Sequence, residues 1–319
     1  MALLHKLRRN LADLIDPETD RQRDAAPASQ AADALVLPIR EVPSFGYADA
    51  AEPSWPAPSR LPPPTPEVND PLAALSYAYR PSWDPARGVI AAYLCVPTLP
   101  EASGTARRAA AALPCRDDIP ELERLDFATL SHGIGVAEGF VHEKRRLLIT
   151  VPVRFETLCV AAHHRRYVET LRTRLSPEAA SLLVVELVGV PSGVPEALLL
   201  EISSPLRAHA RAVIARLGPD ITDFGQFAAA RIAAVGCDLA EQNASELALM
   251  QHMARFSRGA AKAGIATYLR GISTLSLAAA ALGAGFAHLD GDAVALAVDQ
   301  PHGVVQFSLV DLYGPPVEG

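Results

Sequence analysis

The stretch Gly264–Thr274, "GIATYLRGIST", joins a short apolar run to an arginine, a glycine and a long alanine-rich segment. Short apolar runs followed by a helical pattern are typical of strands that are buried on both faces in a parallel sheet. In a barrel or an open α/β sheet, the carboxyl ends of such strands carry the functional groups. The stretch therefore places a cation, Arg270, where a catalytic group is expected, with no carboxylate, lysine or histidine beside it.

The same alternation continues on both sides of this stretch. Helices are predicted at 155–175, 205–217, 243–263 and 274–284. Strands are predicted at Val89–Val96, Leu147–Val153, Leu182–Val188, Asp220–Phe224, Ala233–Leu239, Ile265–Leu269 and Phe286–Leu289, with a closing pair near Val294–Val298 and Val304–Leu309. Such a repeated alternation predicts an α/β fold, a (β/α)8-type barrel. A doubly wound sheet is the alternative, although neither GxGxxG nor GxxxxGK[ST] is present to support it.

Four zones follow from composition. Residues 1–15, "MALLHKLRRNLADLI", have the spacing of a short amphipathic helix, which docks either on its own barrel or on a partner or membrane surface. Residues 16–71 are rich in proline and predict a disordered tether, interrupted by the apolar island Ala34–Tyr47. The barrel is predicted at 72–313, followed by a tail at 314–319. A protein partner is expected to bind through the helix or the island.

The overall composition excludes several classes of protein. The net charge of −7 argues against a general nucleic-acid binder. No apolar run approaches the ~18 residues of a membrane span, and basic residues interrupt the N-terminal apolar stretch, so we expect a cytoplasmic protein. The cysteines show no metal-ligand spacing, so they are predicted to be reduced, and no cofactor is expected: Cys95, Cys115, Cys159 and Cys237.

Six segments, taken in order, carry a family resemblance. "YRPSWDPARGVIAAYLCV" (Tyr79–Val96) resembles a YQP…D segment, a glycine and a strand ending in Glu-Ala-Leu. The others resemble LDxWVL, VNxS…L, ExTE, IDDFGxG and GIxVIAEGVET: "ERLDFATL" (Glu123–Leu130), "ITVPVRFETL" (Ile149–Leu158), "LLVVELVG" (Leu182–Gly189), "ITDFGQ" (Ile221–Gln226) and "GIATYLRGIST". Over about residues 75–313, their order and spacing resemble a degenerate EAL domain. That domain is a modified TIM barrel that hydrolyses cyclic di-GMP in bacterial signalling.

The resemblance implies a site from which most of the family's functional residues are missing. Divalent cations of such phosphodiesterases need several converging oxygen ligands. Here Glu186 and Asp223 keep a carboxylate, whereas Arg270 replaces a metal-binding glutamate and Pro152 replaces an asparagine. The resemblance therefore implies that neither metal nor hydrolysis is retained. The family's site positions fall on Leu94, Pro152, Glu186, Gly189, Thr222, Asp223, Glu241, Arg270, Ser273 and Asp290.

One pair of these positions suggests a replacement for the metal. Counting from the IDDFGxG-like segment places Glu241 at the position of the family's catalytic-site lysine. Arg270 lies at the position of a family glutamate, so the resemblance implies that the positive and the negative charge have changed places. We expect these two side chains to form an ion pair in the barrel mouth. A surface glutamate and a solvated arginine are the alternative.

The expected function is that of a noncatalytic regulatory module that binds another protein. One alternative is a cyclic di-GMP receptor, in which Arg270 contacts a phosphate. Another is a weak or repurposed metal-dependent phosphodiesterase that uses Glu186, Asp223 and Asp290. Barrels of this family often dimerise, so a homodimer stays open.

Overall fold

The computed structural model describes residues 70, 72–100, 106–108, 119–218 and 221–314. The predicted helix 1–15, the island Ala34–Tyr47, the tether apart from Asp70 and the tail beyond Gly314 lie outside this part. The strands are β1 Ser76–Asp84, β2 Val89–Pro100, β3 Ala106–Arg108, β4 Leu148–Arg154, β5 Leu183–Val190, β6 Ala212–Leu217, β7 Ala234–Asp238, β8 Ala266–Arg270, β9 His288–Leu289 and β10 Val305–Gln306. The helices are α4 Ile119–His142, α5 Phe155–Cys159, α6 Ala161–Arg174, α7 Pro177–Ala180, α8 Glu196–Arg207, α9 Gly225–Ala229, the 3-10 helix η1 Leu239–Glu241, α10 Glu246–Lys262, α11 Leu275–Ala284 and α12 Leu309–Leu312.

Eight of the described strands close into one barrel. The ring runs β1, β9, β8, β7, β6, β5, β4 and β2, and it closes because β2 also pairs with β1. β1 is antiparallel to both of its neighbours, whereas the pairings from β2 through β4 to β9 are parallel. The predicted modified (β/α)8 barrel is confirmed.

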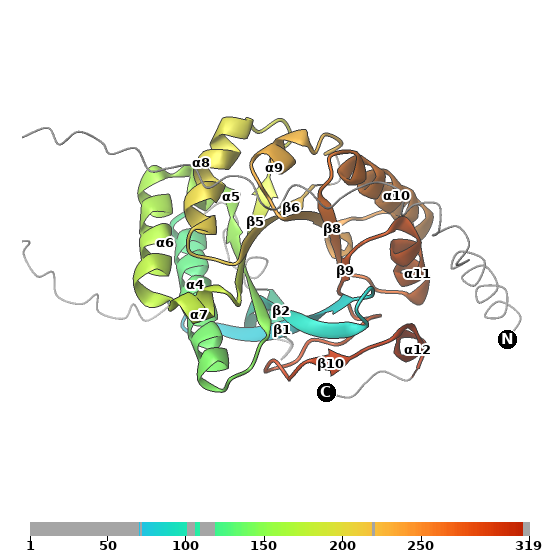
Figure 1. Ribbon diagram of the computed structural model, residues 1–319, viewed down its shortest axis with the longest axis horizontal. Helices are drawn as coiled ribbons and strands as arrows, with labels where there is room; N and C mark the ends of the chain where they lie inside the picture. Colours follow the sequence, from blue (N-terminus) through green and yellow to red (C-terminus); the bar gives the residue numbers. More distant parts are fainter. Residues whose placement is uncertain (1–69, 71, 101–105, 109–118, 219–220, 315–319) are drawn as a thin grey trace, which may run out of the picture. The chain divides into compact units, whose positions relative to one another are not determined.

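Helices cover the barrel from outside. Figure 1 shows α4, α6 and α8 along one flank of the strand ring and α10 and α11 along the other. The strands beneath them are buried on both faces: Val151, Val185, Val213 and Val235 are fully buried. This two-sided burial explains why the strands appear in the sequence as near-continuous apolar runs. None of the described helices combines the length and apolar character needed to cross a bilayer.

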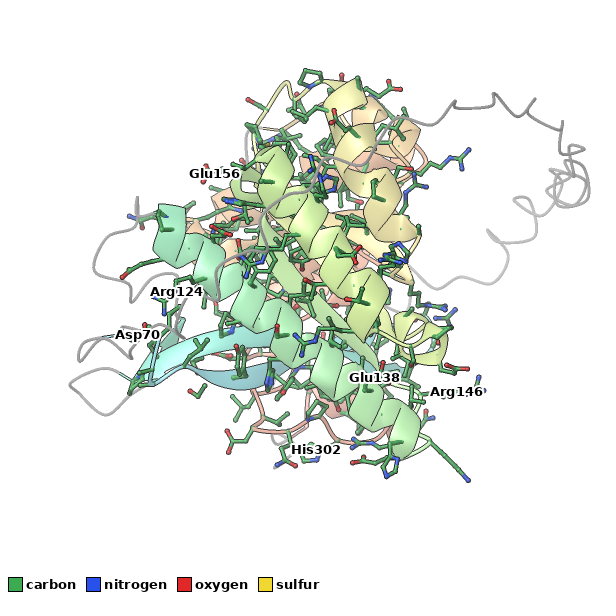
Figure 2. All side chains as sticks on the ribbon, turned by 90° about the vertical axis from the view of Figure 1, so that its left-hand side faces the viewer. Asp70, Arg124, Glu138, Arg146, Glu156 and His302 are labelled. Atoms are coloured by element: carbon green, nitrogen blue, oxygen red, sulfur yellow. The ribbon has the colours of Figure 1, made fainter. Side chains whose placement is uncertain are left out.

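The β1–β2 hairpin has no helix of its own, because a tight turn at Gly88, with φ of +64°, joins the two strands directly. Residues 294–307, here called the C-terminal strap, run along the hairpin instead (Figure 1). Val298 exchanges two backbone hydrogen bonds with Tyr79, and the Trp83 indole N–H donates to the Phe307 carbonyl at 2.7 Å. Asp70 and Arg124 form an ion pair between the chain before β1 and α4 (Figure 2).

Three predicted elements are wrong. Segment 205–217 is not one helix, because α8 ends at Arg207 and Ala212–Leu217 is β6. Alanine and arginine favour helices, but the alternating burial of this segment fits a strand between β5 and β7. Ile221–Phe224 precedes α9 as a loop whose apolar residues are buried, and Asp220 lies outside the described residues. Of the predicted closing pair, only Val305–Gln306 is a strand, while Val298 forms an isolated bridge.

Close packing of α4 on β4 gives a direct test of the barrel. A Cβ added at Gly133 would lie 2.3 Å from a methyl group of Val151, whereas Gly135, two residues further along the helix, has nothing within 4 Å. We expect Gly133→Ala to lower the free energy of unfolding by about 1–3 kcal/mol through overpacking. Gly135→Ala should raise it by about 0.5–1 kcal/mol through helix propensity. Urea denaturation measures both, and equal effects would contradict this packing.

Candidate functional site

A cavity of about 840 Å³ opens at the carboxyl ends of β2, β4, β5 and β6. This is the end of a barrel at which functional groups gather. Its wall is apolar along β2, β4 and α4 and also carries charged side chains of both signs. The apolar residues include Leu94, Val96, Pro97, Leu122, Pro152, Val153 and Val188, and the charged residues are Arg80, Asp126, Arg154, Glu156, Arg216 and Glu241.

Arg216 connects the cavity to a set of buried charges, here called the ionic cluster: Glu186, Arg216, Asp238, Arg270 and Asp290. Arg270 Nε donates to Glu186 Oε1 at 2.8 Å, and its Nη1 donates to Asp290 Oδ2 at 2.5 Å. Arg216 Nη1 donates to Asp238 Oδ2 at 3.0 Å and to Glu241 Oε1 at 3.2 Å. Three buried carboxylates thus share two guanidinium groups.

The local sequence makes room for this cluster. Tyr268 precedes Arg270 by two residues on the same strand face; its ring lies 4.9 Å below the guanidinium, and its hydroxyl donates to Glu186 at 2.7 Å. A Cβ at Gly236, on neighbouring β7, would lie 2.5 Å from that ring. Gly271 has φ of +72°, and a Cβ there would lie 2.4 Å from Asp238 Oδ1. Because Gly271 follows Arg270 and has no side chain, the backbone can turn close to the Asp238 carboxylate at this point.

Burial and charge oppose each other in the cluster. Burial alone would raise the pKa of Glu186, but the guanidinium groups of Arg270 and Arg216 together lower it. For Asp290 burial prevails, and its pKa is raised despite Arg270. Burial disfavours the charged form of Arg270, yet Glu186 and Asp290 raise its pKa. Arg270 is therefore a permanent buried cation.

The remaining carboxylates do not fit a divalent cation. Glu186 and Asp290 each use one oxygen on Arg270, while the buried Glu186 Oε2 and Asp290 Oδ1 have no hydrogen-bond partner among the described residues. A divalent cation needs several oxygens that converge on one point without a competing cation. Across the described residues, no three or more histidine, cysteine or acidic side chains form such a group.

Comparisons with known proteins address the fold. No family model and no curated protein sequence matches the chain. Among solved structures, the PaMucR phosphodiesterase in complex with c-di-GMP matches with 12% identity and a TM-score of 0.56, over 70% of this chain and 97% of that one. The Bacillus subtilis YkuI protein, with an EAL domain, in complex with substrate c-di-GMP and calcium, matches with 14% identity and a TM-score of 0.58, over 74% of this chain and 59% of that one. The barrel has the EAL-type fold.

A third EAL-containing structure, Vibrio cholerae LapD bound to c-di-GMP, matches with 15% identity and a TM-score of 0.52, over 68% of this chain and 52% of that one. At these identities the likeness concerns the fold alone. The chemistry of this EAL-type barrel must therefore be read from its own side chains.

Five of the positions predicted from the EAL resemblance meet in the mouth. Glu186 and Asp290 each accept a hydrogen bond from Arg270 in the ionic cluster. Leu94 and Pro152 line the cavity above it.

The other positions lie elsewhere or have different partners. Glu241 lies on the cavity rim, whereas Thr222, Asp223 and Ser273 are exposed in loops and do not line the cavity. Asp223 accepts a hydrogen bond from the Gly225 amide, as a local turn does. The exposed Gly189, at a bulge in β5, has φ of +75°. The trio Glu186, Asp223 and Asp290 is therefore not brought together.

The expected Glu241–Arg270 ion pair is wrong. Arg270 pairs with Glu186 and Asp290, and Glu241 pairs with Arg216. The reason is position: β7 ends at Asp238, which lies in register with Arg270, and Glu241 follows in η1. Sequence reasoning missed Arg216, Asp238 and Tyr268. A polar residue at the end of each apolar run was the available signal, but the run containing Arg216 was interpreted as a helix.

Asp126 forms a second buried contact on the cavity wall. It pairs with Arg154 at 3.0 Å and accepts a hydrogen bond from Thr157 at 2.5 Å. Burial raises the pKa of Asp126 to about 6, even though Arg154 and Thr157 act in the opposite direction.

Removing the Arg270 guanidinium should leave Glu186 and Asp290 buried without their cation. We expect Arg270→Met to lower the free energy of unfolding by about 3–5 kcal/mol. Adding Glu186→Gln should recover part of that loss, because one uncompensated charge disappears. Arg172, which forms an exposed pair with Glu169, is the matched control, and Arg172→Met should have little effect. Equal unfolding midpoints in urea for the two arginine variants would refute a structural role for the cluster.

Asp126 should make stability depend on pH. Since its pKa is higher in the folded than in the unfolded state, its contribution is fully present below about pH 4 and is lost as the pH rises through about 6. The stability of the wild type relative to Asp126→Asn should therefore fall by about 1–3 kcal/mol between those limits. Denaturant titrations of both proteins across this range measure the difference. A constant difference would show that the carboxyl group is not shifted.

Proposed function

We propose that this chain is a noncatalytic EAL-type domain that acts in bacterial signalling by binding a partner protein. One observation carries the proposal: the Arg270 guanidinium is bonded to both Glu186 and Asp290 inside the barrel mouth. The same strand ends would have to supply carboxylate oxygens to a divalent cation for phosphodiester hydrolysis.

Electrostatics supports this assignment. YkuI, which has a barrel of this fold, was solved in complex with both c-di-GMP and calcium. In this chain, a divalent cation ~5 Å from the Arg270 charge would be repelled by about 7 kcal/mol at an effective dielectric constant of about 20. Two carboxylates already bonded to arginine offer little to offset that repulsion. The step from lost hydrolysis to partner binding rests on analogy with the fold.

A second candidate function is that of a cyclic di-GMP receptor. The cavity is lined by three guanidinium groups, those of Arg80, Arg154 and Arg216, which are suited to phosphate oxygens. Each also lies near a carboxylate: Arg154 beside Asp126, Arg216 beside Asp238, and Arg80 3.7 Å from Asp292. The pair involving Arg80 is the loosest of the three. A bound dinucleotide would therefore engage Arg80 with the least competition.

Titration of cyclic di-GMP into the full chain, with Mg²⁺ and then with EDTA, separates these functions. We expect no hydrolysis and no heat that depends on Mg²⁺, because the cluster offers no cation site. Binding that persists in EDTA and weakens in Arg80→Ala would establish the receptor function. Hydrolysis, or binding that requires Mg²⁺, would overturn the noncatalytic assignment.

A further inference from the structure

We infer that the pocket beneath the C-terminal strap is a docking site for a segment of a partner protein that presents an apolar side chain next to a basic one. This inference rests on the proposed function as a binding module. It places the contact along the outer side of the β1–β2 hairpin rather than in the barrel mouth.

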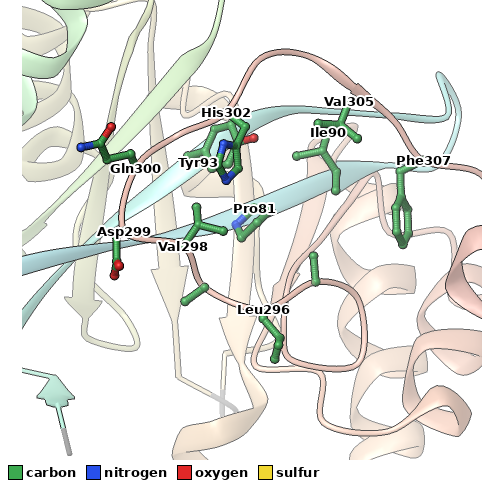
Figure 3. Close-up of a pocket in the computed structure, with 12 residues that line it drawn as sticks. Pro81, Ile90, Tyr93, Leu296, Val298, Asp299, Gln300, His302, Val305 and Phe307 are labelled. Carbon is green, nitrogen blue, oxygen red and sulfur yellow. The ribbon is translucent and has the colours of Figure 1, made fainter. Parts of the chain in front are cut away.

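The pocket is a cavity of about 530 Å³ between the hairpin and the strap. Figure 3 shows Ile90, Val305 and Phe307 toward one end of it and Asp299 and Gln300 toward the other. Cavities that hold ligands or side chains have this size and this composition, a mostly apolar lining with a few polar groups at one end.

The strap that forms the pocket is held in place near its middle and at its end. Near its middle, Arg145 donates a hydrogen bond to the Pro301 carbonyl at 2.5 Å. At its end, the Phe307 carbonyl accepts from Trp83, and the Phe307 ring lies edge-on to the indole at 5.3 Å. The pocket is therefore formed before anything binds, which reduces the entropic cost of docking.

The C-terminal part of the described chain carries many of its exposed apolar side chains. Of the eight large apolar side chains that are exposed in the described part of the chain, four lie between residues 296 and 313: Leu296, Val304, Val310 and Tyr313. Leu296 is 55% exposed at the pocket itself, and Val310 on α12 is 77% exposed. Single exposed apolar residues are ordinary, but Leu296 is exposed at the edge of a mostly apolar cavity, and this combination is typical of an interaction site.

Charge specifies the partner. Asp299 is exposed at the polar end of the pocket and forms no ion pair with any described residue. A carboxylate that lies beside an apolar cavity favours a partner whose apolar side chain is followed by lysine or arginine. An acidic partner segment would be repelled at the same position.

The experiment uses phage-displayed random peptides of about twelve residues, selected on the full chain and depleted on Leu296→Asp. We expect the recovered peptides to combine an aromatic or large aliphatic residue with lysine or arginine. One recovered peptide is then titrated against the variants. Leu296→Asp should weaken binding by about tenfold or more, and Asp299→Asn should weaken it about threefold or more. Leu247, equally apolar and 67% exposed on α10, supplies the control Leu247→Asp, which should bind as the wild type does.

Each contrary outcome overturns the inference. The inference is wrong if the recovered peptides are acidic. It is also wrong if no recovered peptide binds the wild type more tightly than it binds Leu296→Asp. If no peptide is selected, and the wild type is a dimer whereas Leu296→Asp is a monomer, the surface would instead bind a second copy of the chain. The hydrolysis measurement is independent of these results, so the proposed noncatalytic function stands or fails separately.

Discussion

The buried contact of Arg270 with Glu186 and Asp290 is the constraint around which the inside of this barrel is arranged. It joins three parts of the ring, β5, β8 and the end of β9, across an interior that excludes water. A charge in such a place must find partners, because its desolvation costs several kcal/mol. The Tyr268 hydroxyl also donates to Glu186 Oε1, and the second guanidinium, that of Arg216, lies 3.9 Å from the same oxygen. Further interior features, such as the glycines at 236 and 271, are accommodations to that arrangement.

The fold was largely predictable because two-sided burial leaves a plain pattern in sequence. Val151, Val185 and Val235 lie in apolar runs that only strands of a covered sheet need. The prediction failed at β6, where alanine and arginine resemble a helix and the decision depends on neighbouring strands.

The candidate site was predictable only in part. Glu186 and Asp290 were predicted from the order and spacing of the EAL-like segments, and Arg270 was predicted because it ends an apolar run. The partner of Arg270 was not, since η1 removes Glu241 from the strand end by three residues, and no sequence pattern reports that turn. Which carboxylate meets which cation depends on barrel closure. Closure brings β5 and β8 together although 82 residues separate Glu186 from Tyr268.

The glycine at 236 restricts how this sequence can change. A side chain there would overlap both the Tyr268 ring and the Tyr268 carbonyl oxygen, each 2.5 Å from an added Cβ, so replacing Tyr268 alone would not make room for it. Losing Tyr268 removes a hydrogen-bond donor from Glu186 and the ring beneath Arg270. A carboxylate at position 270 would place a third acid beside Glu186 and Asp290. Each of these single changes is unfavourable while the surrounding residues stay as they are, so the packing of the barrel interior preserves its present set of charges.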